Sequence, residues 1–391
     1  MNKDMEYNYD VGIIGAGASG LMAGLELTLA GRKVIVLEAR DRPGGRMHTV
    51  QKYNFTVPVE SGAEFIHGKL EMTLHLLDKA GIPYYPVEGS AWQKRKNALC
   101  QQEDFIEDFD KLKSKFDQLD VDLSVADFIE SYLNDPELEN LRFTVKNYVE
   151  GYYAADLHKA STFALRQELT QSDDEQFRIE GGYVKLVEYL VREMADKGGL
   201  IIYNHLVEEV NWETSQVIIK AGGKRIVCSQ VLSTIPLGVW QDGCLPFVPA
   251  LTEKVNLAKK LGSGNVIKIL LQFKEPFWHW PEITQGNDLK SLGFLFSNEK
   301  IPTWWTQYPK NSNVLTGWLG GPPASDMQDE TEDELIDRAL QSLVSIFQIE
   351  RKALDNLLMA ATSVNWMKDA FTRGGYSYEV VNGAAIQERI A

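Results

Sequence analysis

YDVGIIGAGASGLMAGLELTLAGRKVIVLEARDRPGGR, residues 9–46, is the stretch that decides the fold of this chain. It opens with a short apolar run, Val11–Ile14, which predicts a strand. A glycine-rich turn follows, and the almost wholly apolar residues 21–30 predict a buried helix. A second apolar run, residues 34–37, predicts another strand that ends at Glu38. The order strand, glycine turn, helix, strand is typical of one half of a doubly wound α/β domain.

The glycine turn carries the spacing of a dinucleotide-binding site. Gly15 permits the tight turn, Gly17 lets the backbone approach a pyrophosphate, and Gly20 lets the helix pack closely on the strand. The pyrophosphate would lie on free N–H groups at the helix N-terminus, next to Ala18 and Ser19. Taken without its context, such a pattern is often only a glycine-rich turn.

The acidic residue at the end of the second strand indicates which dinucleotide. Glu38 would accept hydrogen bonds from a ribose diol, which disfavours a cofactor with a 2′-phosphate at that point. The segment that follows, EARDRPGGR from Glu38 to Arg46, resembles the second signature of the flavin-containing amine oxidase family. That family includes monoamine oxidases, polyamine oxidases and L-amino-acid oxidases. A diphosphate would lie closely against this segment and be neutralised by it, in contact with Ala39, Arg40, Gly45 and Arg46. By itself the segment would be a solvated basic loop, but in this place it favours FAD.

The resemblance implies an α/β fold, in which a Rossmann-type FAD-binding domain like that of glutathione reductase is interleaved with an α+β substrate domain. Strands are predicted at residues 53–59, 200–203, 207–212, 217–220, 225–232, 266–273, 292–296, 304–308 and 314–319, and helices after Ser124, at 184–194 and at 335–347. The predicted parts are FAD-binding segments 1–85 and 198–255, a helical substrate subdomain 86–197, a substrate sheet and helix 256–361, and the start of a third FAD segment 362–391.

Composition narrows the classes of function. At 44% hydrophobic and 24% charged residues, the chain has the composition of an ordinary globular protein. The net charge of −15 speaks against nucleic acid and anionic membranes as partners. Three widely spaced cysteines give neither a disulfide framework nor metal-ligand spacing, so a reducing, cytoplasmic location is expected. No signal peptide, membrane anchor or metal is expected, and the oligomeric state stays open.

A second segment, GAEFIHG from Gly62 to Gly68, resembles the family segment that passes along the flavin ring. The resemblance gives that role to the backbone of Gly62, Ala63, Glu64 and Phe65, and its His-Gly ending places His67 near the substrate amine, as in polyamine and spermine oxidases. Glu64 is either a structural acid or a ligand of the substrate ammonium. His67 could otherwise be a satisfied turn residue.

The predicted strand 266–273 contains a lysine among apolar residues. Lys268 shares its face with Val266 and Leu270, which favours a lysine that points into a pocket, whereas strand lysines usually mark a solvent face or an edge. Lys268 also matches the family lysine that holds a water against flavin N5.

Several further residues take roles from the resemblance alone. Val207 would contact adenine through its backbone, Trp366 would border the isoalloxazine, and Tyr376 would form a wall of the aromatic cage around the amine. Gly375 stands where some monoamine oxidases tether the flavin through cysteine, so non-covalent FAD is expected. The aromatic pairs Tyr152–Tyr153 and Trp304–Trp305 are interpreted as core. The Gly-Thr-rich helix start that completes the family's flavin site is not found before Ala391, which predicts a truncated chain with weakened FAD binding.

The predicted activity is oxidative deamination of an amine, with dioxygen reduced to hydrogen peroxide. His67-Gly68 and the acidic composition favour a polyamine or its acetylated form as substrate. A monoamine is the second alternative. An L-amino acid is third, because Glu64 and Phe65 disfavour a carboxylate-bearing substrate. A non-catalytic nucleotide-binding protein is the alternative from another class.

Overall fold

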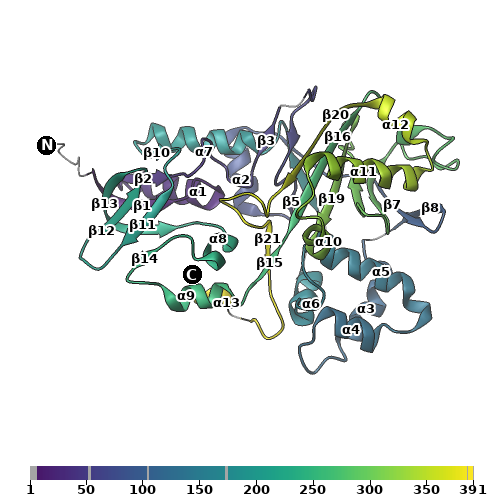
Figure 1. The fold of residues 1–391 in the computed structure, drawn as a ribbon, viewed down its shortest axis with the longest axis horizontal. Coiled ribbons are helices and arrows are strands. Elements are labelled where there is room, and N and C mark those ends of the chain that lie inside the picture. The colour runs from purple at the N-terminus through teal and green to yellow at the C-terminus, as the bar shows by residue number, and fades with distance from the viewer. Residues whose placement is uncertain (1–6, 52–53, 104, 172–174, 385, 391) are drawn as a thin grey trace.

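Two seven-stranded sheets organise the computed structural model, which describes residues 7–51, 54–103, 105–171, 175–384 and 386–390. Figure 1 shows one sheet on the left, built around β1, and the other on the right, built around β16. A group of helices lies below the second sheet in the same view. The predicted α/β class with an interleaved second domain is confirmed, because the chain passes between the two sheets several times.

The first sheet contains the dinucleotide fingerprint. Its strand order is β10-β2-β1-β13-β12-β11-β14. The bounds are β1 Tyr7–Ile14, β2 Val34–Leu37, β10 Leu200–Ile202, β11 Val207–Asn211, β12 Val217–Ala221, β13 Lys224–Ser233 and β14 Phe247–Val248. The four strands from β10 to β13 run parallel, while β12 is antiparallel to both of its neighbours. A hairpin turn joins β12 and β13, with positive φ at both Gly222 and Gly223.

Two helices cover one face of this sheet. Helix α1 (Ala18–Leu29) packs beside α7 (Val184–Asp196), and both contribute to an apolar cluster with β1 and β2. The near-absence of polar residues in α1 is explained by this position, since the helix lies between the sheet and other elements. Helix α2 (Glu71–Ala80) also packs against α7 and ends at Gly81 in the left-handed conformation.

The second sheet has the order β20-β16-β19-β18-β17-β7-β8. The bounds are β7 Ser90–Arg95, β8 Ala98–Gln102, β16 Val266–Phe273, β17 Leu292–Phe296, β18 Thr303–Trp305, β19 Val314–Gly320 and β20 Leu358–Asn365. Every residue of β16 is buried because the strand is central and both of its faces are covered. Helix α11 (Glu332–Phe347) covers one face and begins with a capping box between Thr331 and Glu334.

The helical part has its own apolar cluster, to which Phe116 and Phe128 contribute. It consists of α3 Phe109–Phe116, α4 Val125–Tyr132, η1 Pro136–Leu138, α5 Glu139–Asn147, η2 Tyr148–Tyr152 and α6 Thr162–Gln171. Ser124 caps α4 by accepting the Asp127 N–H at 3.1 Å, as the sequence predicts. The π-helical turn η2 brings this part to the second sheet, where the Trp318 indole donates to the Gly151 carbonyl at 2.6 Å.

Short strands and helices join these parts. The bounds are β3 Thr49–Val50, β4 Val59–Glu60, β5 Ile66–His67, β6 Tyr84–Pro86, β9 Gln176–Ile179, β15 Gly262–Gly264, β21 Tyr376–Tyr378, η3 Phe277–His279, α8 Leu237–Asp242, α9 Thr252–Ala258, α10 Gly321–Asp326, α12 Arg351–Leu357 and α13 Ile386–Ile390. Strand β9 lies between β5 and β6. Strand β21 pairs with β15 and so returns the end of the chain to the space between the two sheets (Figure 1).

Some predicted elements differ from the structure. The strand expected at residues 53–59 is wrong where the chain is described: residues 54–58 are turns and bends, and only Val59 begins a strand, because the two-residue ladder β3–β4 replaces it. Residue 53 lies outside the described residues. Strands β7 and β8 lie inside the segment 86–197 that was expected to be helical, and α7 from that segment packs on the dinucleotide sheet. None of the described helices is both long and apolar enough to cross a membrane.

Candidate active site

A large cavity of about 980 Å³ opens where β1 and β2 end. Predicted cofactor residues line it: Gly15, Gly17, Ala18, Ser19, Glu38, Ala39, Arg40, Gly45, Arg46 and Val207. Gly20 lies behind this wall and is buried. The cavity therefore gathers the two motifs of the first segment with a residue of β11, which lies about 170 positions later in the chain.

The glycines of this cavity have the geometry that a bound pyrophosphate needs. Gly15 has φ +102°, in the region that favours glycine. A Cβ on Gly20 would lie 1.9 Å from the Gly15 carbonyl oxygen, so only glycine allows the helix to approach the turn. A Cβ on Gly17 would meet no atom within 4 Å and would stand in the cavity. The residues present therefore fit a dinucleotide phosphate.

Glu38 is more constrained than the sequence suggested. Its side chain is buried and accepts the Ala16 N–H at 2.7 Å and the Arg40 N–H at 2.9 Å. These contacts fix the carboxylate at the edge of the cavity. Because a carboxylate has further lone pairs, Glu38 can still accept a hydrogen bond from a ribose hydroxyl.

Two arginines of the segment 38–46 bind residues 369–375, near the end of the chain, and hold them against this cavity. Arg40 donates to Asp369 and, at 2.8 Å, to the hydroxyl of Thr372. Arg46 donates to the Gly375 carbonyl. Burial lowers the pKa of Arg46, and no described acid is paired with this guanidinium. The last segment is therefore held in place by the same residues that would neutralise the diphosphate.

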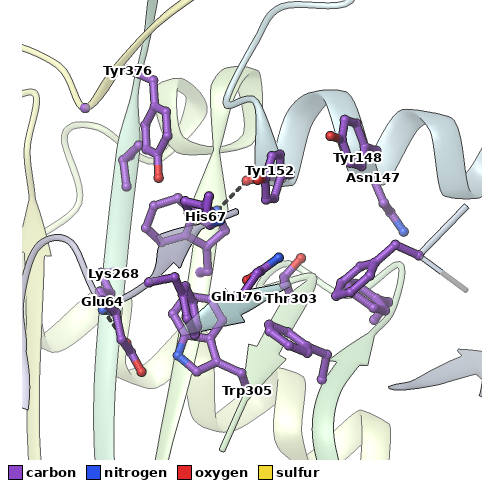
Figure 2. Close-up of a pocket in the computed structure, with 18 of the residues that line it drawn as sticks. Glu64, His67, Asn147, Tyr148, Tyr152, Gln176, Lys268, Thr303, Trp305 and Tyr376 are labelled. Atoms are coloured by element: carbon purple, nitrogen blue, oxygen red, sulfur yellow. Dashed lines mark hydrogen bonds and ion pairs between the residues drawn. The ribbon is translucent and has the colours of Figure 1, made fainter. Parts of the chain in front are cut away.

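A second cavity of about 430 Å³ adjoins the first and lies between the second sheet and the helical part. Predicted residues line it: Gly62, Ala63, Glu64, Phe65, His67, Lys268, Trp366 and Tyr376. Arg46, Tyr376 and Ser377 line both cavities. A dinucleotide in the first cavity would thus present one end to the second, where Figure 2 shows Tyr376, His67 and Lys268 around the same space.

Lys268 points into this region from β16 and is paired with an acid. It is 1% exposed and donates to Glu64 Oε2 at 2.7 Å and to the Gly62 carbonyl at 3.2 Å. Its Nζ also lies 5.3 Å from the centre of the Trp305 ring. The geometry is that of a pocket-facing lysine, as the apolar neighbours of the strand predict.

Glu64 lies between two buried cations. Its Oε1 accepts from Arg178 Nε at 3.2 Å and from Gln307 at 2.9 Å, while Oε2 faces Lys268. Burial alone raises the pKa of Glu64, but the charges of Lys268 and Arg178 outweigh it and lower the pKa to about 2. Both oxygens are thus engaged by protein groups. Of the two alternatives for Glu64, the arrangement favours the structural acid over a ligand of the substrate ammonium, because the charge of the carboxylate is already compensated.

His67 lies across the cavity from this network. Burial lowers its pKa to about 4, so the imidazole is neutral at neutral pH. Its Nδ1 is buried and has no hydrogen-bond partner among the described groups. The ring meets Tyr152 edge to face with centroids 5.0 Å apart, and Figure 2 shows the two side chains pointing toward one another. Tyr152 therefore lines the cavity and is not the core residue that was expected, whereas Tyr153 packs in the helical cluster as predicted.

Aromatic side chains form most of the remaining wall. Trp305 lines the cavity and Trp304 is buried in the core of the second sheet, because adjacent residues of β18 face opposite sides. The core interpretation is confirmed for Trp304, while Trp305, which is also buried, is the one of the pair that lines the cavity. Trp366 is buried and donates to the Ser61 carbonyl at 3.0 Å, and Tyr376 meets Trp318 edge to face at 6.1 Å.

Sequence reasoning missed the groups that hold Glu64. Arg178 is 3% exposed and also donates to the carbonyls of Tyr308 and Thr306, and Gln307 comes from the loop after β18. The available signal was an arginine between Phe177 and Ile179 on a short strand. Such a residue is either an edge residue or a buried cation that needs an acid.

One more buried acid lies near this network. Glu60 accepts the Tyr183 N–H at 2.6 Å and the Thr49 hydroxyl at 2.9 Å, at the start of α7. Burial raises the pKa of Glu60 to about 7, against the opposing effects of these hydrogen bonds and of Lys268. Unlike Glu64, this carboxyl has no cation in direct contact among the described groups.

Comparison with known proteins decides the family. The family model described as flavin containing amine oxidoreductase matches residues 18–385. This chain belongs to that family. Probable polyamine oxidase 4 of Arabidopsis thaliana is 25% identical over 97% of this chain and 79% of its own length, and polyamine oxidase 2 of the same plant is 27% identical over 94% and 78%. A putrescine oxidase structure with bound putrescine superimposes with TM-score 0.77 at 21% identity, covering 98% of this chain and 90% of that one.

Family membership assigns the cofactor and the class of reaction. The flavin of this family, placed in a cavity built for a dinucleotide, is FAD, and the chain is a flavin-dependent amine oxidoreductase. The predictions of FAD and of an enzyme are confirmed.

The two glycines of the turn give a matched pair of variants. Gly20→Ala is expected to lower the free energy of unfolding by about 2–4 kcal/mol, because its methyl group collides with the Gly15 carbonyl. Gly17→Ala is expected to leave stability without FAD within about 0.5 kcal/mol, but to weaken FAD binding at least about tenfold, because its methyl group enters the phosphate space. Urea unfolding and FAD titration measure both. A Gly17→Ala variant with native FAD affinity would contradict the placement of the pyrophosphate.

The charge network predicts a large cost for neutralising its acid. Glu64→Gln is expected to lower the free energy of unfolding by about 3–5 kcal/mol, because two buried cations lose their counter-ion. Adding Lys268→Met should recover part of the loss. Glu188→Gln, which changes a mostly exposed acid of α7, is the control and should stay within about 0.5 kcal/mol. Equal stability of Glu64→Gln and the native chain would exclude this role for Glu64.

Glu60 predicts a pH dependence with a definite sign. Because its pKa is raised from 4.5 to about 7, the folded state binds more protons than the unfolded state between these values, and stability is lost as pH rises through them. Glu60→Gln removes this loss. The free energy of unfolding of the variant minus that of the native chain should therefore grow by about 3 kcal/mol from pH 4.5 to 7.5, measured by urea unfolding. A difference that does not vary with pH would refute the raised pKa.

Proposed function

We propose that this chain oxidises an uncharged amine to an imine in the second cavity, with FAD held in the first and dioxygen as the final acceptor. The observation that carries the proposal is the junction of the two cavities at Arg46, Tyr376 and Ser377. The amine cavity and the dinucleotide cavity are adjacent, and the paired lysine and the neutral histidine lie in the former.

The protein groups prepare the amine for oxidation. Loss of hydride from the carbon next to nitrogen needs the nitrogen lone pair, so the amine must bind without its proton. The aromatic wall disfavours an ammonium by desolvation, and His67 Nδ1 can accept a hydrogen bond from the amine N–H. With its pKa near 4, His67 stays neutral at neutral pH and serves the amine as a hydrogen-bond acceptor.

The Lys268 ammonium supplies a fixed positive charge on the cavity wall, where its partners Glu64 and the Gly62 carbonyl hold it. A charge fixed in this way stabilises the negative charge that develops as dioxygen is reduced, and it can hold a water near the flavin. When bound, FAD supplies the two-electron acceptor, so that the amine becomes an imine that water hydrolyses, and dioxygen becomes hydrogen peroxide. With glycine at position 375, FAD would be held without a covalent bond.

The names of the relatives bear on the substrate. Two are polyamine oxidases and the solved structure is a putrescine oxidase, which supports a polyamine or its acetylated form, in agreement with the His67-Gly68 match. A monoamine is the second alternative.

The deciding experiment is the absorption spectrum of the purified chain with FAD, recorded without oxygen before and after an amine is added. We expect the flavin band near 450 nm to bleach with at least one of spermine, an acetylated polyamine or phenylethylamine, and to return with hydrogen peroxide when air is admitted. Leucine should leave the band unchanged. A band that none of the amines bleaches would overturn the proposal, and bleaching by leucine alone would overturn the choice of amine over amino acid.

A further inference from the structure

The charged groups that line the amine cavity are few, and its carboxylate is already paired with cations. Among the lining residues that the structure describes, only Arg46, Glu64 and Lys268 carry charge at neutral pH. Glu64 is the one carboxylate of that described lining, and its oxygens are taken by Lys268, Arg178 and Gln307. The described wall therefore offers no free carboxylate to a second ammonium of the substrate.

The side of the cavity away from Lys268 is lined by neutral groups. Figure 2 shows Asn147 there, with Gln176 and Thr303 between it and His67. In the described part of the chain, the side chains of these three residues form no hydrogen bond to another protein group, so they can serve an amide or a hydroxyl of the ligand. Phe105, which meets Phe294 at 5.2 Å, adds aromatic surface to the cavity.

We propose that this cavity selects amines with a single basic nitrogen and an uncharged tail, apolar or amide-bearing, over free diamines and polyamines. The inference rests on the proposed oxidation of amines and narrows its substrate class. It distinguishes acetylated polyamines from free polyamines as substrates, a distinction that the names of the relatives do not make.

The expected selectivity follows from the ionisation of the second nitrogen. An alkylammonium has a pKa near 10.4, so shedding the proton at pH 7.4 costs about a factor of 10³. Contact of the cation with aromatic rings recovers part of that factor. We therefore expect an acylated diamine to exceed the free diamine by about 100-fold in kcat/KM. The reacting nitrogen must lose its proton in both compounds, so its contribution cancels in the comparison.

The test compares N-acetylputrescine with putrescine, which differ by one acetyl group, on the FAD-loaded chain at pH 7.4. kcat/KM is measured for both compounds, and their dissociation constants are measured by anaerobic calorimetry after the FAD has been reduced, so that no turnover contributes to the heat. Preference for N-acetylputrescine by about 100-fold would support the inference. Equal rates, or a preference for putrescine, would overturn it while leaving amine oxidation intact. Failure of both compounds, of spermine and of phenylethylamine to bleach the flavin would overturn the proposed function and the inference with it.

A charge variant supplies an independent test. Asn147→Asp places a carboxylate of nearly the same shape on the distal wall, and it is expected to raise kcat/KM for putrescine at least about tenfold and to lower the preference for the acetylated compound. Asn134→Asp adds the same charge at an exposed position outside the cavity and should change neither value. An Asn147→Asp variant that is folded but gains no putrescine activity would contradict the inference that the lack of a free carboxylate at the distal wall limits the oxidation of putrescine.

Discussion

The burial of one carboxylate between two cations is the constraint on which the rest of the site depends. Glu64, Lys268 and Arg178 are each less than a tenth exposed, and none of them could remain charged in this place without the others. They come from the loop after β4, from the central strand β16 and from β9. Because the network must form as a unit, it fixes the position of the first FAD-binding segment, residues 1–85, against the second sheet. The same network leaves Lys268 as an oriented charge on the cavity wall and leaves Glu64 unavailable to ligands.

The last segment of the chain has a comparable role on the other side of the cofactor cavity. Arg40 and Arg46 bind groups between Asp369 and Gly375, and β21 pairs with β15. Tyr376 is thereby placed at the border between the cavities and Trp366 in the wall of the second, although they follow the fingerprint by more than 300 positions. The cation that would neutralise a diphosphate thus also holds an aromatic residue of the amine cavity, so the two sites share one scaffold.

Local patterns predicted the dinucleotide part well because its determinants are close together in the sequence. Glycine spacing, two apolar runs and an acid at the strand end are local signals, and the structure places Gly15, Gly17 and Glu38 accordingly. Lys268 was predicted for a similar reason, since period-two alternation assigns its face. Arg178, Tyr152 and Trp305 were missed or assigned to the core, because a buried cation and a cavity-facing ring have the sequence pattern of ordinary packing residues. Arg178 lies 114 positions from its partner Glu64, and Tyr152 lies in a different part of the chain from His67, so a local pattern does not encode these contacts.

The ion network also limits how a substrate can enter. If the first FAD-binding segment, residues 1–85, moved away from the second sheet, Lys268 would be separated from Glu64. The two charges would then be left unpaired in a poorly hydrated interior. Hinged opening of the two halves is therefore disfavoured as a route of access. The smaller motion is rotation of side chains at the rim, and Phe105, which lines the cavity and is 43% exposed, is placed to act in this way. Access to the cavity would then depend on the side chains that surround it, Phe105 among them, rather than on separation of the two sheets.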